Sequence, residues 1–392
     1  MPQLVLVANA RMPSQRAQSL QVMHAAAAFA RLGWETTILH AQRADTPGGD
    51  RSALLAYYGV EPELDLHVRA VPCLDWIDRV PRAAQFLPAR LQEWTFARRA
   101  ARTLVREYPR ARVLSREIET SHALAQRADG FLEIHRVPGG SLRRRWLREA
   151  ALRAAGVIAI SGGVREDLVD LGVEPGSILV EHDAFDHQRF GALPTRAAAR
   201  AELGIEPGEK LVVYTGGLLA WKGVEILLGA AERMPEVSFL VAGGMNADVA
   251  RLAKRAEGLA NVRLDGFQPP DRIPLYLAAG DLGVVPNRSQ PAISARYTSP
   301  LKVFEAMAAR LPLVVSDLPS LRDILGSQDA LFVAPDDPVA LAQGIASLLS
   351  DPTLRENLGR SLGARAVEHT FEARAQRILE WMQVRSGTVR QP

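Results

Sequence analysis

The sequence predicts two doubly wound α/β domains in tandem. Its length, 392 residues, exceeds what one hydrophobic core usually supports. Short apolar runs of strand length alternate with segments of helical period, a pattern typical of a parallel sheet with crossover helices. The strand–loop–helix pattern that opens the chain returns at residues 210–233. The repeat of a complete α/β unit therefore predicts two similar halves.

The first half begins with a predicted strand at residues 4–8, a helix that ends at Gly33, and a second strand at 35–40. Residues 54–112 include Pro72, Pro81 and Pro88 and predict helix only near 91–108. The remaining elements alternate regularly. Strands are predicted at 113–114, 131–134, 157–160 and 178–181, and helices at 122–127, 142–155 and 163–171.

The stretch 187–196 predicts the boundary, so the domains are expected at residues 1–188 and 189–370, with a C-terminal helix within 371–392. The second half repeats the alternation. Strands are predicted at 210–215, 238–242, 262–264, 282–285, 312–316 and 330–333.

Composition excludes several classes. Hydrophobic residues make up 47% and charged residues 23%, as in an ordinary globular protein. The one cysteine, Cys73, excludes an intrachain disulfide and a cysteine-based zinc site, which fits a reducing compartment. No apolar run approaches the ~20 residues that span a bilayer, and the N-terminus lacks the basic start of a signal peptide. A cytoplasmic protein is expected.

The segment around residues 297–317 is the strongest candidate for chemistry. Ser299 is a favourable N-cap, and Pro300 suits the first helical position. The amides near Leu301 and Lys302 would then form an anion site that the helix dipole reinforces. Glu305, one turn deeper, could accept hydrogen bonds from the vicinal hydroxyls of a ribose. The alternative is a capped helix with surface charges.

A second candidate follows the strand at 210–215. Gly216 and Gly217 form a turn, and Lys222-Gly223 opens a helix. Glycine lets the backbone approach a phosphate, and a lysine at the helix start can neutralise a leaving group. The segment is not a P-loop, because the pattern Gly-x-x-x-x-Gly-Lys-Ser/Thr is absent. By itself the turn could equally be only a turn.

Together these segments resemble the donor site of family-4 retaining glycosyltransferases with the GT-B fold. The resemblance rests on Lys222-Gly223 after the glycine turn and on Glu305-Ala-Met-Ala some 80 residues later. Shorter matches in the expected order extend it over nearly the whole chain. It implies two Rossmann-like domains facing a central cleft, with the C-terminal helix packing back on the first domain. It also implies retaining transfer of a hexose from a nucleotide-diphosphate sugar to a hydroxyl acceptor, without a cofactor or metal. The acceptor would be a lipid-linked glycan, a polysaccharide or a small molecule.

Residue roles follow from the same resemblance. His135, Lys222 and Glu305 are expected to act in catalysis, with Glu133 orienting His135. The expected donor contacts are Gly216, Gly217, Gly244, Phe267, Pro286, Tyr297, Ser299, Pro300, Leu301 and Lys302. Arg11, Ser14 and Arg16, in the loop after the first strand, are expected to line the acceptor side.

Three positions depart from the family pattern. Tyr297 stands where the first Glu of the Glu-x7-Glu element is usual, Gly217 where a basic residue is usual, and Arg310 where a glycine is usual. The charge missing at Gly217 is expected from Arg288, Arg296, Lys302 or an arginine of the first domain.

Two other classes of function stay open. A nucleotide-sugar epimerase or hydrolase would share the fold and would form product without an acceptor. A non-catalytic nucleotide-sugar-binding protein is the other alternative. An oxidoreductase is disfavoured because Gly-x-Gly-x-x-Gly follows neither opening strand, and no Asp-x-Asp metal motif is present.

Residues 79–153 are strongly basic, with seventeen Arg against seven Asp or Glu in a chain of net charge +3. Trp94, Phe96 and Trp146 lie among these arginines, which indicates contact with an anionic membrane surface. The alternative is a solvated helix face. No nucleic-acid-reading motif accompanies the charge, so no nucleic-acid partner is expected.

Overall fold

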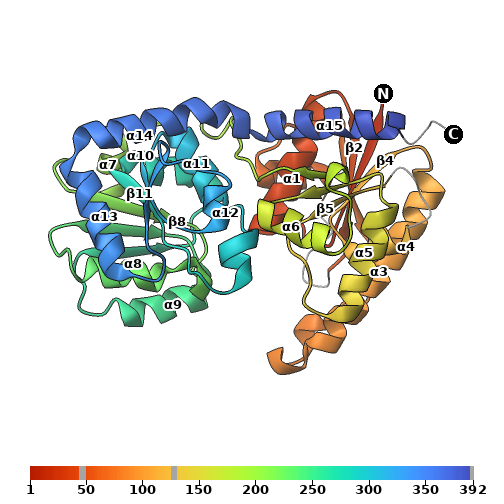
Figure 1. The fold of residues 1–392 in the computed structure, drawn as a ribbon, viewed down its shortest axis with the longest axis horizontal. Helices are drawn as coiled ribbons and strands as arrows, with labels where there is room; N and C mark the ends of the chain where they lie inside the picture. Colours follow the sequence, from red (N-terminus) through yellow and green to blue (C-terminus); the bar gives the residue numbers. More distant parts are fainter. Residues whose placement is uncertain (44–49, 125–129, 389–392) are drawn as a thin grey trace. The chain divides into compact units, whose positions relative to one another are not determined.

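The structure, a computed structural model, describes residues 1–43, 50–124 and 130–388. It divides into two compact units of one architecture, a parallel sheet between helices (Figure 1). Unit 1 comprises Met1–Ile160, Val164–Glu181 and Phe371–Pro392; unit 2 comprises Ser161–Gly163 and His182–Thr370. The predicted doubly wound α/β class is confirmed.

Unit 1 contains a seven-stranded sheet in the order β3-β2-β1-β4-β5-β6-β7. Its strands are β1 (Gln3–Ala8), β2 (Glu35–Ala41), β3 (Leu66–Val71), β4 (Arg112–Ser115), β5 (Gly130–Ile134), β6 (Gly156–Ala159) and β7 (Ile178–Val180). Its helices are α1 (Ala17–Arg31), α2 (Arg51–Tyr58), α3 (Phe86–Glu107), α4 (Ile118–Ala123), α5 (Ser141–Arg153), most of α6 (Gly162–Asp170) and α15 (Phe371–Thr388). Helices cover both faces of the sheet, so β1 is buried almost throughout and reads as a continuous apolar run.

Two elements of unit 1 differ from the sequence prediction. Strand β3 was missed, because it lies at the sheet edge, where His67 is exposed and its apolar alternation is weak. Helix α4 begins at Ile118, before the predicted start at 122. The rest of that prediction, residues 125–127, lies outside the described residues.

The C-terminal helix α15 belongs to unit 1 and packs on α1. Arg31 of α1 pairs with Glu372 at 2.5 Å. Trp381 meets the ring of Phe131, on β5, edge-on at 5.7 Å between centroids. The last helix of the sequence therefore completes the core of the first unit.

Unit 2 contains a six-stranded parallel sheet in the order β10-β9-β8-β11-β12-β13. Its strands are β8 (Leu211–Thr215), β9 (Ser238–Ala242), β10 (Val262–Gly266), β11 (Leu282–Val285), β12 (Leu313–Ser316) and β13 (Ala330–Val333). Its helices are α7 (Arg196–Leu203), α8 (Val224–Ala231), α9 (Asn246–Arg255), α10 (Ile273–Ala279), α11 (Leu301–Ala309), α12 (Pro319–Arg322), α13 (Pro338–Ser350) and α14 (Pro352–Arg365). All six strands lie within two residues of the positions predicted from sequence.

The chain enters unit 2 at His182, ahead of the boundary expected at 188/189. Phe185 and Phe190 are buried in a core cluster of unit 2 and contact each other edge-on at 5.7 Å. These two aromatic side chains attach the connecting segment to the second core.

Both sheets follow the Rossmann strand order, which reverses direction once. In unit 2 the reversal lies between β8 and β11, and ligands of such sheets bind beyond the carboxyl ends of the strands at that point. Gly216 follows β8, and Pro286 follows β11. The fold thus places both candidate segments, the glycine turn with Lys222 and the segment around residues 297–317, at the ligand-binding edge of unit 2.

Candidate functional site

Glycine is required in the turn after β8. Gly216 has φ +121°, and its N–H donates to the Ala242 carbonyl at 2.9 Å. A β-carbon on Gly243 would collide with the Gly216 backbone, so the turns after β8 and β9 are closely packed. The Tyr214 hydroxyl donates to the Gly217 carbonyl at 2.7 Å. The turn is therefore fixed, and its surroundings leave space at Gly217.

Lys222 is held at the end of β11 by the glycine that follows it. Gly223 has φ +71°, and a β-carbon there would collide with the Pro286 carbonyl oxygen. This close approach positions the short helix Ala220–Lys222 beside the switch point, the place between β8 and β11 where the strand order reverses. Helix α8 begins immediately afterwards. The predicted helix start at Lys222-Gly223 is confirmed.

Lys302, on α11, lies beneath the glycine turn. Its side chain is buried, and its Nζ lies 3.4 Å from the ring centroid of Tyr214. Among the described residues Nζ has no hydrogen-bond partner. Burial, and next the charge of Lys222, hold the pKa of Lys302 well below its ordinary value. A buried ammonium without a hydrogen-bond acceptor is a strong site for an anion.

Three charged groups are coupled at this edge. Burial lowers the pKa of Lys222, and the charge of Glu305 opposes that shift. Burial raises the pKa of Glu305, against the influence of Arg189, Lys302 and Lys222. Lys222, Lys302 and Glu305 thus form one electrostatic cluster, as groups that bind a charged ligand do.

The start of α11 differs in detail from the prediction. Pro300 is the N-cap, Leu301 is the first helical residue, and no side chain caps the helix. The Ser299 hydroxyl instead accepts the N–H of Asp183 at 2.9 Å, because that buried amide needs an acceptor. Val303 donates to the Pro300 carbonyl, whereas the amides of Leu301 and Lys302, the first two residues of α11, have no acceptor within the helix. The N-cap assignment of Ser299 was wrong.

The other predicted donor residues lie along the same edge. Gly244, at φ +91°, packs on the Leu218 side chain, and Phe267 directly follows β10 and is half-buried. Tyr297 ends the π-helix Ile293–Tyr297, with the Arg296 guanidinium 5.7 Å from its ring centroid. Gly244 and Phe267 lie further along the sheet from the switch point than Gly216 does.

Two residues of this site were missed by sequence reasoning. Asn287 follows Pro286, is 1% exposed, and neither polar atom of its side chain has a partner among the described residues. Arg189 reaches the field of Glu305 from the segment that was interpreted as a domain boundary. For Asn287 the signal was available, since a polar residue directly after a buried strand end is typical of ligand sites. Arg288, one of the expected sources of charge, pairs with Asp336 at 2.9 Å.

In unit 1, His135 follows β5 and belongs to a buried ionic cluster. Its Nε2 lies 2.7 Å from Oε1 of Glu133 and 2.7 Å from a guanidinium nitrogen of Arg116. Arg374, on α15, approaches Oε2 of Glu133 at 3.2 Å. Burial by itself would raise the pKa of Glu133. The charges of Arg374 and Arg116 outweigh it and hold that pKa well below its ordinary value. Glu133 stays ionised and fixes the imidazole.

The loop after β1 carries the remaining predicted residues. Arg11 pairs with Asp78 at 2.7 Å. Ser14 is engaged within the loop: its N–H donates to the Tyr58 hydroxyl at 2.8 Å, and its hydroxyl accepts the Arg16 N–H at 3.3 Å. The Arg16 side chain is exposed at the start of α1. Arg16 therefore remains accessible, whereas Ser14 holds the loop.

The described part of the chain contains neither a metal-binding cluster nor a membrane-spanning helix. Within it, no group of three or more His, Cys, Asp and Glu side chains could hold a metal ion. None of its helices combines the length and the apolar character that crossing a membrane requires.

Residues 209–351 match the profile of the family described as glycosyl transferases group 1. A D-inositol 3-phosphate glycosyltransferase of Segniliparus rotundus is 31% identical over 229 residues, 53% of this chain and 49% of that protein. An alpha-maltose-1-phosphate synthase of Mycobacterium tuberculosis is 26% identical over 59% of this chain and 63% of that protein. The chain spans about half the length of the first of these relatives.

Solved structures share the fold over the whole chain. A sucrose-phosphate synthase from Thermosynechococcus elongatus matches with TM-score 0.78 and 18% identity, covering 99% of this chain and all of that one. Anabaena HepE in complex with UDP matches with TM-score 0.74 and 17% identity, covering 98% and 100%. Residues 209–351 are therefore similar to the glycosyl transferases group 1 family, within a chain that has the GT-B fold.

Proposed function

We propose that this protein is a retaining glycosyltransferase that moves a hexose from a nucleotide-diphosphate sugar to a hydroxyl acceptor. The observation that carries the proposal is the cluster of Lys222, Lys302 and Glu305 beside the glycine turn at the switch point of unit 2. The match of residues 209–351 to the group 1 family supports the proposal. A uridine nucleotide is the first donor to test, because HepE was solved with UDP and UDP-glucose.

Each donor-side residue has a distinct task in this mechanism. The amides of Leu301 and Lys302 and the two lysine ammonium groups bind the diphosphate, and Lys222 stabilises the charge that develops as it leaves. Glu305 accepts hydrogen bonds from the ribose hydroxyls. The buried side-chain amide of Asn287 has no hydrogen-bond partner among the described residues, and the bound nucleotide sugar supplies one.

The bond between the anomeric carbon and the diphosphate oxygen breaks while the acceptor oxygen attacks on the same face. The proton of the acceptor hydroxyl leaves with the diphosphate oxygen, so no protein nucleophile is needed. His135, oriented by Glu133, forms a hydrogen bond with a sugar hydroxyl and holds the sugar in the reactive position. Lysines and helix amides supply the positive charge, so transfer proceeds without a metal or cofactor.

The test is the kinetics of two donor-side variants. Lys222→Ala should lower kcat by roughly 10²-fold or more, since it removes a group that stabilises the leaving charge. Glu305→Ala should raise the donor KM. Lys254→Ala is the matched control, because Lys254 is an exposed lysine of the same unit, and it should behave as wild type. Wild-type kinetics for Lys222→Ala and Glu305→Ala would remove the assignment.

The same assays separate the alternatives. Nucleotide release or epimer formation without any acceptor would identify a hydrolase or an epimerase. Thermal stabilisation by UDP, GDP or ADP and their sugars without any turnover would identify a binding protein.

We also propose that unit 1 binds anionic membrane surfaces through helices α3 and α5 from the cytoplasmic side. The two helices are linked through Glu119 of α4, which lies 2.8 Å from Arg143 and 3.9 Å from Arg90. Figure 1 draws α3 and α5 beside α4 along one side of the unit. Both helices carry exposed arginines: Arg98, Arg99, Arg102, Arg106, Arg144, Arg145, Arg148 and Arg153.

The apolar anchors differ in part from those expected from sequence. Trp94 is 48% exposed, as the prediction requires, but Phe96 is 1% exposed and belongs to the core, and Trp146 is half-buried and stacked on His122. Phe86 and Leu87, which the prediction did not name, are exposed by 67% and 74%. The start of α3 is therefore the part that enters the lipid interface.

A further inference from the structure

The loop after β11 is held on two sides. On the first side it lies against the segment that follows the glycine turn of unit 2. The N–H of Arg288 donates to the Trp221 carbonyl at 2.9 Å, and a β-carbon on Gly223 would collide with the Pro286 carbonyl oxygen. Asn287 stands between these two contacts and is 1% exposed. The backbone on both sides of Asn287 is therefore fixed against this segment.

On the second side the loop is held by one carboxylate, that of Asp336. Nε of Arg288 donates to Oδ1 of Asp336 at 2.9 Å, and the N–H of Ser289 donates to Oδ2 at 3.1 Å. The Ser289 hydroxyl also donates to Oδ2. Asp336 follows β13, which lies two places from β11 in the sheet. The three hydrogen bonds therefore join two loops that strand pairing does not join.

The backbone of Asp336 has an unusual conformation, with φ +60°. This is the left-handed region, which glycine adopts most easily and aspartate more readily than most residues do. Burial acts to raise the pKa of Asp336, but hydrogen bonds from Ser289 and Arg288 hold that pKa below its ordinary value. The side chain is therefore a carboxylate at neutral pH. Substitution by glycine would remove it without straining the backbone.

The group that depends on this fixation is the side-chain amide of Asn287. Neither of its polar atoms has a hydrogen-bond partner among the described residues, so no bond of its own holds it in place. A buried amide without partners costs free energy unless a ligand completes its hydrogen bonds. Its position follows from the backbone, which Trp221 holds on one side of the loop and Asp336 on the other.

We propose that Asp336 is a positioning residue: it holds the loop after β11 so that the Asn287 amide meets the bound nucleotide sugar. This inference rests on the proposed function, because it takes the edge of unit 2 at Lys222 as the donor site. It also gives Arg288 a task within the loop rather than on the diphosphate. Loss of the Asp336 carboxylate therefore weakens donor binding. An Arg288 that Asp336 only kept away from the diphosphate would, once released, strengthen it.

Calorimetric titration of the whole chain with UDP-glucose, GDP-glucose and ADP-glucose tests the proposal, and the nucleotide sugar that binds the wild type best serves as the probe. Asp336→Gly should weaken its binding roughly fivefold, the factor that one net hydrogen bond is worth. Asp336→Asn keeps an oxygen acceptor and tolerates a positive φ, so it should recover part of the affinity. Ser289→Ala removes one of the three hydrogen bonds and should weaken binding less. It replaces Asp336→Gly if that variant does not fold.

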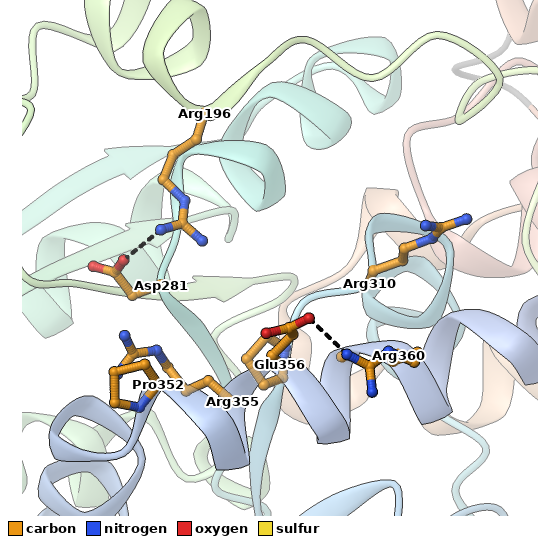
Figure 2. A pocket seen from close by; sticks show the side chains of 9 residues that line it. Arg196, Asp281, Arg310, Pro352, Arg355, Glu356 and Arg360 are labelled. Atoms are coloured by element: carbon orange, nitrogen blue, oxygen red, sulfur yellow. Dashed lines mark hydrogen bonds and ion pairs between the residues drawn. The ribbon is translucent and has the colours of Figure 1, made fainter.

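Arg310→Gly is the matched control. Arg310 is the other non-glycine residue with positive φ in the described part of the chain, at +53°. It lines a hollow together with Asp281, which directly precedes β11, so it lies at the amino ends of the strands and away from Asn287 (Figure 2). This variant changes the backbone preference in the same way and should bind the probe as the wild type does.

A double-mutant cycle with Asn287→Ala separates positioning from a general loosening of the fold. If Asp336 acts through Asn287, Asp336→Gly should weaken binding much less in the Asn287→Ala background than in the wild type. Equal weakening in both backgrounds, unchanged binding, or tighter binding by Asp336→Gly would overturn the proposal. If the wild-type chain binds none of the three nucleotide sugars, the proposed function fails and this inference fails with it.

Discussion

The paired lysines of unit 2 show how burial prepares a side chain for an anion. Among the described residues, the Lys302 ammonium contacts the Tyr214 ring and has no hydrogen-bond partner. Its charged form is therefore stabilised less than it would be in water, which lowers its pKa. A diphosphate that reaches Nζ supplies the missing negative charge. Binding energy and proton uptake are therefore linked at this residue.

We predict that nucleotide binding takes up a proton through Lys302. Burial lowers the pKa of the free lysine, and a bound diphosphate raises it again. Between these two pKa values the bound state holds more protons, so affinity for UDP should fall as the pH rises through that window. Calorimetry in buffers of different ionisation enthalpy measures the uptake. Lys302→Met should abolish it, and uptake that persists in this variant would assign the proton to another group.

A second residue couples folding to pH. Glu117, after β4, accepts the N–H of Asn9 at 2.7 Å, and burial raises its pKa to about 7. A raised pKa in the folded state gives stability that is fully present below the unfolded pKa and is lost as the pH rises through 7. Glu117→Gln keeps the acceptor for Asn9. It should therefore stabilise the protein at pH 8 by roughly 1–3 kcal/mol relative to wild type, with little gain at pH 5.

Urea unfolding at the two pH values checks this, with Glu107→Gln as the control because that carboxylate is exposed and its pKa is lowered. Equal effects of Glu117→Gln at both pH values would contradict the prediction.

At the scale of elements, α15 acts on a strand end far away in sequence. Arg374 is 4% exposed and neutralises Glu133, which in turn holds His135. Removing one partner of a buried ion pair leaves the other charge uncompensated, which is more costly than losing an exposed pair.

Arg374→Gln should therefore destabilise the fold by roughly 3 kcal/mol at pH 7. Arg377→Gln, on the same helix, breaks a pair with Glu181 in which the arginine is 40% exposed, and it should cost only about 1 kcal/mol. Urea denaturation measures both. Equal costs would mean that the Arg374 contact contributes no more than a partly solvated ion pair. In the NMR spectrum, Arg374→Gln and not Arg377→Gln should shift the ring resonances of His135.

For the whole molecule, the uneven charge predicts salt-sensitive membrane binding by unit 1. Each basic residue near an anionic surface contributes about 1 kcal/mol, so a few acting together give weak, reversible binding. The chain should float with anionic liposomes at low salt and not at 1 M salt, where the Debye length is ~3 Å. The double substitution Leu87→Ser and Trp94→Ser should weaken flotation. Phe96 is unsuitable for this test, because it is buried in the core. Failure of the chain to bind anionic vesicles at low salt, or tighter binding to RNA than to these vesicles, would refute the proposal.

The sequence by itself predicted much of this architecture. Alternating apolar runs located the strands of unit 2, because buried parallel strands are apolar on both faces. Gly216 and Gly223 could be recognised locally, since their positive φ depends on the turn itself. Lys222 and Lys302 could be located in the same way, because Lys222 stands just before the glycine that starts α8 and Lys302 lies in the first turn of α11. Glu305 lies one turn further along α11.

Only the tertiary structure decided the long-range pairings. Which face of α3 buries Phe96 depends on the core beneath it, and Ser299 finds Asp183 across 116 residues of sequence. The contact of Arg374 with Glu133 likewise joins segments that lie far apart along the chain. Local patterns determine where elements begin and end. Packing between distant elements determines which polar groups are buried together, and that energy has no signature in neighbouring residues.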